Sequence, residues 1–274
     1  MIRFPAFLGR RAVPILIATM VAALVGGVVH RTPSAGSGLG IATDTIDLSS
    51  LRGAPPPPDP VRILPTAAVS ARTRPSPSLI VRISHSLPIT SRPGGGRQVG
   101  VMRAGSLQLG SPTFAWVISV TRNGKYGRVP IPYTGRSGTG WIRLRGLRRS
   151  HTWITVVADL SKHLIEVKRR GKVILRIQAA TGAPGTPTPT GRYFVTDRVP
   201  FSAGGPYGTF AFGISGMQPR LASQWPRNQL AIHGTNNPGS IGRSLSSGCL
   251  RVSERSLAQL KPLLQLGTPV IIQR

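Results

Sequence analysis

Two residues whose side chains can perform acyl transfer stand near the C-terminal end of the chain. Cys249 is the only cysteine among the 274 residues, and His233 precedes it by sixteen positions. A cysteine attacks carbonyl carbon as its thiolate, and a histidine titrates near neutral pH. The segment that joins them, HGTNNPGSIGRSLSSGCLR, is rich in Gly, Ser and Asn, which permits tight backbone turns. We therefore predict a Cys–His acyl-transfer site.

The neighbours of the cysteine indicate how the thiol is activated. A predicted helix follows within a few residues, and Arg251 adds a fixed positive charge. Both favour the thiolate and predict a thiol pKa well below its usual value of about 8.5. The backbone N–H groups of Ser247, Gly248 and Cys249 are candidate donors for an oxyanion hole.

Metal binding is the competing chemistry for these two residues. Cys249 and His233 supply two ligands, whereas a structural zinc site needs four. His151 and His163 belong to other predicted strands, and the acidic residues show no ligand spacing. We expect no metal and no cofactor. A lone cysteine cannot form a disulfide within the chain, so an inert buried thiol or an intermolecular bridge is the other alternative.

The N-terminal segments predict export. Arg3, Arg10 and Arg11 precede a charge-free apolar run, Val13 to Val29, which is typical of an export signal or a single membrane anchor. The lack of a small-x-small cleavage site after this run favours a retained anchor at residues 13–29. We expect residues 1–31 to be this segment and residues 32–77 to be a disordered Pro/Ser/Gly linker. The rest of the chain then lies in the cell envelope or is secreted to the wall.

The charge of the chain suggests an anionic partner. The formal net charge is +28, and residues 96–149 carry ten Lys or Arg and no acid. Such a surface attracts polyanions, including anionic cell-wall polymers, although an arginine-biased proteome explains the excess equally well. Because the chain is expected to be exported, we do not expect nucleic acid as a partner.

The hydrophobic pattern predicts two folded parts, both rich in β-strand. Residues 78–149 contain short alternating runs separated by turn signals, among them a hairpin turn at Asn123-Gly124. This part resembles a small SH3-like β-barrel, which would bind the wall or act as a spacer. In residues 150–274 we expect successive strands, a mobile flap or groove wall at 201–218, and a final strand at 268–273. A helix is expected from Ser253 to Leu264, with Ser253 as its N-cap and Glu254 near its positive end.

Three motifs carry a family resemblance over about residues 152–274. The segments HGTNNPGSIGRSLSSGCLRV, TPTPTG and LGTPVII resemble the catalytic domain of the L,D-transpeptidases of bacterial cell walls. The resemblance implies a mostly-β catalytic domain of the β-sandwich type that acts as a cysteine acyltransferase. Such an enzyme attacks a peptidoglycan stem peptide after its third residue, a diamino acid, and releases the terminal D-alanine. It passes the acyl group to an amine of a neighbouring stem, with L,D-carboxypeptidase action as a side activity.

The resemblance also implies roles for individual residues. Cys249 is the nucleophile and His233 the acid/base, with Gly234 orienting the histidine through its backbone. Ser247 stands where family members commonly carry a second histidine. The residues that we expect to bind substrate are Arg251, Tyr207, Gly248 and Thr235.

The departure at Ser247 keeps an alternative function open. If that histidine is needed for turnover, the catalytic domain is vestigial. The chain would then be a non-catalytic cell-wall-binding protein, which acts through its basic SH3-like module.

Overall fold

The computed structural model describes residues 75–135, 137–221 and 228–274. The predicted export segment and residues 32–74 of the predicted linker lie outside these ranges. Within them the chain is mostly β, with a single α-helix, which confirms the predicted fold class at this level. No helix in the described ranges is long and apolar enough to cross a membrane.

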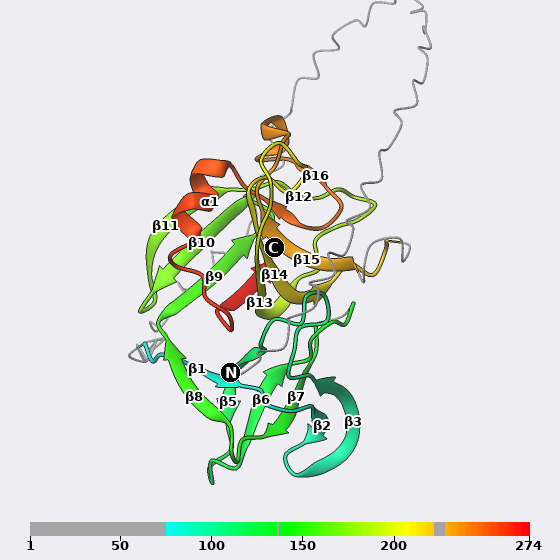
Figure 1. The fold of residues 1–274 in the computed structure, drawn as a ribbon, viewed down its shortest axis with the longest axis vertical. Helices are drawn as coiled ribbons and strands as arrows, with labels where there is room; N and C mark the ends of the chain where they lie inside the picture. The colour runs from blue at the N-terminus through cyan, green and yellow to red at the C-terminus, as the bar shows by residue number, and fades with distance from the viewer. Residues whose placement is uncertain (1–74, 136, 222–227) are drawn as a thin grey trace, which may run out of the picture. The chain divides into compact units, whose positions relative to one another are not determined.

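Residues 78–152 form a three-stranded sheet in the order β4-β1-β8 and a five-stranded sheet in the order β3-β2-β7-β6-β5 (Figure 1). The strands are β1 (Ser78–Arg82), β2 (Leu87–Arg92), β3 (Gly95–Met102), β4 (Phe114–Val117), β5 (Ser119–Val120), β6 (Tyr126–Pro130), β7 (Thr139–Arg143) and β8 (Arg148–Thr152). The hairpin predicted at Asn123-Gly124 is confirmed, because β5 pairs with β6 around it and Gly124 has a φ of 69°. We call residues 78–152 the first segment.

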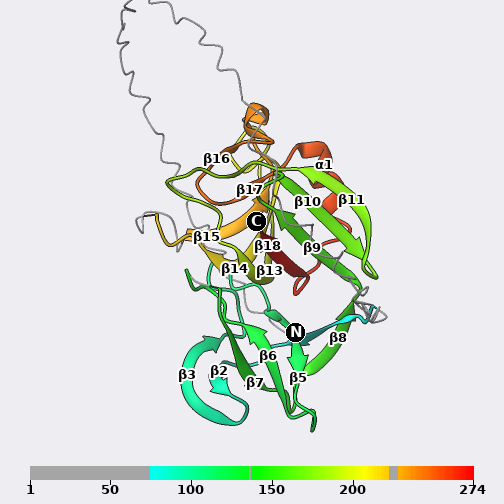
Figure 2. The same ribbon diagram turned by 180° about the vertical axis from the view of Figure 1, so that it is seen from behind.

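The remaining strands build one large sheet in the order β11-β10-β9-β18-β13-β14-β15-β17 (Figure 2), with β12 and β16 as a separate pair (Figure 1). Their bounds are β9 (Ile154–Asp159), β10 (Leu164–Arg169), β11 (Lys172–Gln178), β12 (Thr181–Gly182), β13 (Gly191–Pro200), β14 (Phe210–Met217), β15 (Gln229–His233), β16 (Ser244–Ser246), β17 (Leu250–Arg251) and β18 (Pro269–Gln273). A short 3-10 turn, Pro238–Ser240, lies between β15 and β16. The domain limits predicted from the sequence stay a prediction.

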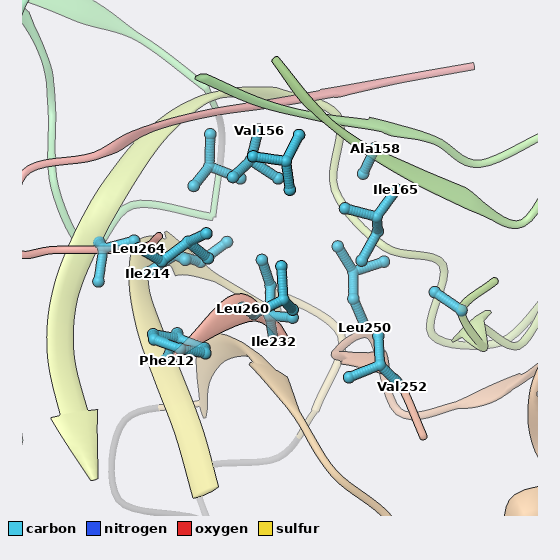
Figure 3. Close-up of a cluster of buried hydrophobic side chains, with 14 of the residues drawn as sticks. Val156, Ala158, Ile165, Phe212, Ile214, Ile232, Leu250, Val252, Leu260 and Leu264 are labelled. Carbon is cyan, nitrogen blue, oxygen red and sulfur yellow. The ribbon is translucent and has the colours of Figure 1, made fainter. Parts of the chain in front are cut away.

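The helix α1 (Glu254–Leu260) covers the core of this sheet. Its N-cap is Ser253, as predicted, and the Ser253 hydroxyl accepts a hydrogen bond from the N–H of Ser256. The helix ends at Leu260, two residues before Pro262, which agrees with the expectation that this proline ends it early. Leu257, Leu260 and the following Leu264 are fully buried against residues of the sheet such as Phe212 and Ile232 (Figure 3).

Residues 201–218, expected as a mobile flap or the wall of a groove, are partly loop and partly strand, and both parts line one cavity, as the second alternative predicts. Residues 210–217 form β14, a central strand between β13 and β15, while residues 201–209 precede it without regular structure. Glycine is typical of loops, but two glycines of this strand are required because neighbouring side chains leave no room for a Cβ. A Cβ at Gly216 would lie 2.7 Å from the ring of Tyr193, and one at Gly213 would lie 3.0 Å from the Asp197 carboxylate.

Strand β13 has buried side chains in two hydrophobic clusters. Successive side chains of a strand point to opposite faces. Tyr193 and Val195 belong to the core that contains α1, whereas Phe194 belongs to the core of the first segment. Phe194 is fully buried there. Phe194, together with the partly buried Ile271 of β18, thus packs the larger sheet against the core of the first segment.

Replacing the Phe194 side chain should destabilise the protein strongly. We expect Phe194→Ala to lower the free energy of unfolding by about 3–5 kcal/mol, because it removes a fully buried ring and leaves a cavity. Ile174→Ala is the control: Ile174 is 44 % exposed on β11, and its loss should cost less than about 1 kcal/mol. Urea unfolding followed by tryptophan fluorescence measures both, and similar losses for the two variants would contradict this account.

Candidate active site

Parallel pairing of two strands brings the halves of the predicted site together. Strand β15 pairs with β17, and His233 lies opposite Arg251 in that register. The pairing is extended by the N–H of Val252, which donates to the carbonyl of His233 at 2.9 Å. Cys249 immediately precedes β17, and its thiol lies 3.9 Å from the carbonyl oxygen of Gln229 in β15. The cysteine and the histidine are therefore held by neighbouring strands.

A buried serine shapes the turn that carries the cysteine. The hydroxyl of Ser246 donates to the carbonyl of Cys249 at 2.6 Å and accepts from the N–H of Gly248 at 3.0 Å. The carbonyl of Ser246 accepts in turn from the N–H of Ala183 at 2.8 Å and from the hydroxyl of Thr186 at 3.2 Å. Sequence reasoning chose the neighbouring Ser247 and missed Ser246, since nothing in the sequence says which of two adjacent serines is buried.

Gly248 is required by the same turn. Its φ is 116°, and a Cβ there would overlap the side-chain nitrogen of Gln218. Gln218 is buried, and its Nε2 donates to the carbonyls of Thr186 and Pro187 at 3.1 and 3.0 Å. This glutamine, a second residue that sequence reasoning missed, ties the proline-rich loop to the cysteine turn. The N–H of Gly248 is already bonded to Ser246, so it is not an available oxyanion donor.

The hydrogen bond of His233 fixes its tautomer. The Nδ1 atom lies 2.5 Å from the carbonyl oxygen of Gly234, and a carbonyl can only accept. Nδ1 therefore carries the proton, and Nε2 keeps the lone pair that a base needs. His233 is 3 % exposed. Burial lowers its pKa to about 4, the bond to Gly234 opposes this, and the nearby Arg251 lowers the pKa further.

The cysteine differs electrostatically from the prediction. Burial raises the pKa of the Cys249 thiol, and this outweighs the lowering by the backbone of Ala231 and by Arg251. The expected low thiol pKa is therefore wrong for this state of the protein, because the sequence showed a nearby helix but not the burial. Since the histidine is also neutral, the pair is uncharged at pH 7.

The cysteine and the histidine line one cavity of about 410 Å³. Of the other predicted site residues, Ser247, Arg251 and Tyr207 also line it, whereas Gly234, Thr235 and Gly248 do not. Thr235 is a turn residue: its hydroxyl accepts from the N–H of Asn237 at 3.0 Å. Across the described ranges, no group of three or more His, Cys, Asp or Glu side chains is placed to bind a metal ion.

The ring of Tyr207 lies against His233, and the loop that carries this tyrosine is bonded to the start of the helix at Thr209. The two rings meet edge-on, with centroids 5.0 Å apart. Burial raises the pKa of Tyr207, and Cys249 adds to the rise, which places the phenol near the thiol. The Glu254 carboxylate accepts from the N–H and hydroxyl of Thr209 at 3.1 and 2.5 Å. A half-buried thiol and a base of defined tautomer that line one cavity are the parts that a cysteine acyl-transfer type of site requires.

Comparison with known proteins identifies the family. The family model of the YkuD L,D-transpeptidase catalytic domain matches residues 154–272. A Bacillus licheniformis protein, provisionally named L,D-transpeptidase YkuD, is 30% identical over 132 residues, which cover 48% of this chain and 73% of the relative. Its Bacillus subtilis counterpart is 29% identical over 119 residues, 43% of this chain and 65% of the relative. The chain belongs to the L,D-transpeptidase family.

Solved structures of L,D-transpeptidases are also similar. The enzyme of Mycobacterium smegmatis has 18% sequence identity and a TM-score of 0.39, with 71% of this chain and 99% of that chain covered. A mutant of the Enterococcus faecium enzyme has 22% identity and a TM-score of 0.36, with 44% of this chain and 49% of that chain covered. Because both TM-scores are below 0.5, the family assignment rests on the sequence matches.

The cysteine turn should not tolerate a side chain at position 248. We expect Gly248→Ala to lower the free energy of unfolding by about 1–3 kcal/mol and to displace Cys249, because a φ of 116° is strained for alanine. Gly239→Ala is the matched control in the same loop, since a Cβ there would come no closer than 3.6 Å to any neighbour. Urea unfolding and the alkylation rate of Cys249 by iodoacetamide measure the two effects. Equal behaviour of the two variants would disprove this role of Gly248.

The low pKa of His233 predicts a stability that falls in acid. Above pH 6.5 the histidine is neutral in both the folded and unfolded chain. Between pH 6.5 and about 4, the unfolded chain binds a proton that the folded chain does not. Stability should fall by about 3 kcal/mol across this window. Urea unfolding of wild type and His233→Gln at several pH values isolates this contribution, and parallel pH curves would contradict the assignment.

Proposed function

We propose that the protein is a peptidoglycan L,D-transpeptidase that works through an acyl-enzyme on Cys249. The observation that carries this proposal is the cavity lined by both the half-buried thiol of Cys249 and a histidine with an unprotonated Nε2. Membership of the family supplies the reaction class. Both groups are neutral at rest, so the thiol proton must pass to the imidazole as the sulfur attacks.

The first half of the proposed reaction is the acylation of Cys249. The Cys249 sulfur attacks the carbonyl after the third residue of a donor stem peptide, while Nε2 of His233 accepts the thiol proton. The N–H groups of Ser247 and Cys249 are the donors proposed for the oxyanion, because that of Gly248 is bonded to Ser246. The imidazolium then protonates the leaving amine, the carbon–nitrogen bond breaks, and D-alanine departs. A thioester remains on Cys249.

Transfer of the acyl group repeats these steps with a new amine. The side-chain amine of a neighbouring stem attacks the thioester, His233 takes its proton, and the thiolate leaves and is reprotonated. This forms the cross-link. Water in place of the amine gives the L,D-carboxypeptidase side activity. Arg251 lines the cavity and is the positive group proposed to attract the terminal carboxylate of the donor.

The remaining parts of the chain fit work at the cell wall. We propose that residues 1–31 export or anchor the protein, with residues 13–29 in the membrane, and that residues 32–77 carry the folded part outward. The first segment is proposed to be an SH3-like module. Its lack of acidic residues between 96 and 149 suits contact with anionic wall polymers.

Acylation by a carbapenem tests the proposed chemistry. We expect one covalent adduct per wild-type chain by intact-mass spectrometry and none on Cys249→Ala. His233→Ala should be acylated about 100-fold more slowly or worse, since it lacks the base. His85→Ala, which removes an exposed histidine of the first segment, is the matched control and should behave as wild type.

The natural reaction is tested with a disaccharide-tetrapeptide, from which the wild type should release D-alanine. A wild type that acquires no adduct, yet sediments with purified peptidoglycan, would favour the non-catalytic wall-binding function that Ser247 motivates. If acylation proceeds with serine at this position, the second histidine of the family motif is not required for it here.

A further inference from the structure

A loop of the first segment contributes to the catalytic cavity. Residues 103–113, between β3 and β4, contain Gln108 and Leu109, and both line the cavity that holds Cys249 and His233. Every other residue of the cavity lining comes from beyond position 196. We call residues 103–113 the cavity loop. The eight-stranded sheet and its loops, which we call the catalytic sheet, therefore do not line the whole cavity: the first segment supplies part of its wall.

Hydrogen bonds within the first segment hold the cavity loop in shape. The hydroxyl of Ser106 accepts from the N–H groups of Ser111 and Leu109 at 3.1 and 3.4 Å. The N–H of Leu107 donates to the hydroxyl of Tyr133 at 3.1 Å, and the N–H of Thr113 to the carbonyl of Ala104 at 2.8 Å. A loop bonded in this way presents a defined surface rather than a mobile one.

A buried polar contact fastens the cavity loop to the catalytic sheet. The Ser106 hydroxyl donates to the carboxylate of Asp197 on β13. Asp197 is 2 % exposed and has no Lys or Arg within salt-bridge distance among the described residues. Burying a carboxylate without donors is costly, so the donors it does have are important to the structure. They are the Ser106 hydroxyl and the Nε2 of Gln229, which lies 3.2 Å from the carboxylate.

Gln229 connects the Ser106–Asp197 contact to Cys249. Gln229 bonds Asp197 with its side chain, and its backbone carbonyl accepts from the thiol of Cys249. The Gln229 side chain also donates to the hydroxyl of Thr196 at 2.7 Å and to the carbonyl of Ile214 at 3.1 Å. The cavity loop, Asp197 and the resting position of the thiol therefore belong to one hydrogen-bonded set.

Leu109 gives the cavity loop an exposed apolar tip. Its side chain is 58 % exposed although it lines the cavity. Phe201, from the segment before β14, is the other large apolar residue of the lining that is substantially exposed, at 42 %. Two exposed apolar side chains from different segments beside a nucleophile suit contact with the aliphatic parts of a peptide.

We propose that the cavity loop positions the donor substrate, with Leu109 packing on the aliphatic part of the stem peptide and the Ser106–Asp197 bond holding the loop in place. This inference rests on the proposed function of the site. It makes the first segment part of substrate recognition at the catalytic cavity. Leu109 is a substrate contact, and Ser106 is a positioning residue that acts through the loop.

Steady-state kinetics with a disaccharide-tetrapeptide tests the role of Leu109. Leu109→Asn keeps the size of an exposed side chain and removes its apolar character. Covering about half of a leucine side chain corresponds to roughly a fivefold change in binding, so we expect KM to rise about fivefold with kcat unchanged. Val120→Asn is the control, since Val120 is an exposed residue of the same segment outside the cavity lining. The alkylation rate of Cys249 by iodoacetamide should stay the same in both variants.

The outcomes separate this inference from the proposed function. A wild type that releases no D-alanine would refute the function itself. An active wild type with equal KM values in Leu109→Asn and Val120→Asn would refute the role of Leu109. A parallel loss of iodoacetamide reactivity in Leu109→Asn would also refute it, because the thiol rather than the substrate would then be affected.

Ser106 is tested by loss and restoration of its hydroxyl. Ser106→Ala should raise KM several-fold, whereas Ser106→Thr, which keeps a hydroxyl, should stay near the wild-type KM. Thermal unfolding of the three proteins shows whether a kinetic change follows general destabilisation. A wild-type KM in Ser106→Ala, or equal impairment in the two variants, would overturn the positioning role.

Discussion

The geometry of the site depends on one buried hydroxyl, that of Ser246. It bonds the carbonyl of Cys249 and the N–H of Gly248, so it closes the turn from inside. Its own backbone is fastened to the proline-rich loop through Ala183 and Thr186. Gly248 must then adopt a φ that other residues avoid, with its α-carbon against Gln218. Neutral groups outside the proposed chemistry thus fix the position of Cys249.

The burial of Cys249 and His233 also determines their protonation states. It raises the pKa of Cys249 and lowers that of His233 to about 4, so both are neutral at pH 7. Arg251 favours the thiolate but opposes the imidazolium, so its effects on the two members of the pair conflict. A preformed thiolate–imidazolium pair is therefore not the resting state. In the proposed reaction the thiolate forms only as the sulfur attacks, and this restricts the proposed reaction to substrates that fit the cavity.

The sequence predicts regular features well and long-range ones poorly. Strand β9 alternates strictly between buried and less buried residues, and Ser253 caps its helix by a local rule, so both were predictable. Strand β14 was not, because its glycines are explained only by the neighbours that pack against them. Likewise the side chains of Gln218 and Asp197 and the backbone carbonyl of Ser246 have partners 31 or more residues away in sequence. No spacing rule reveals such contacts.

Strand β13 explains how the first segment and the catalytic sheet share one site. Strict alternation would place Asp197 on the same face as Tyr193 and Val195, inside the apolar core. The register of β13 with β14 shifts between Val195 and Asp197, and such a bulge re-aims the side chain that follows it. Asp197 instead meets Ser106 and Gln229 at the cavity. Because Phe194 on the same strand enters the core of the first segment, one strand supplies both an apolar and a polar attachment for it. The apolar one is non-directional and contributes most to stability, whereas the polar one is directional and sets where the cavity loop lies.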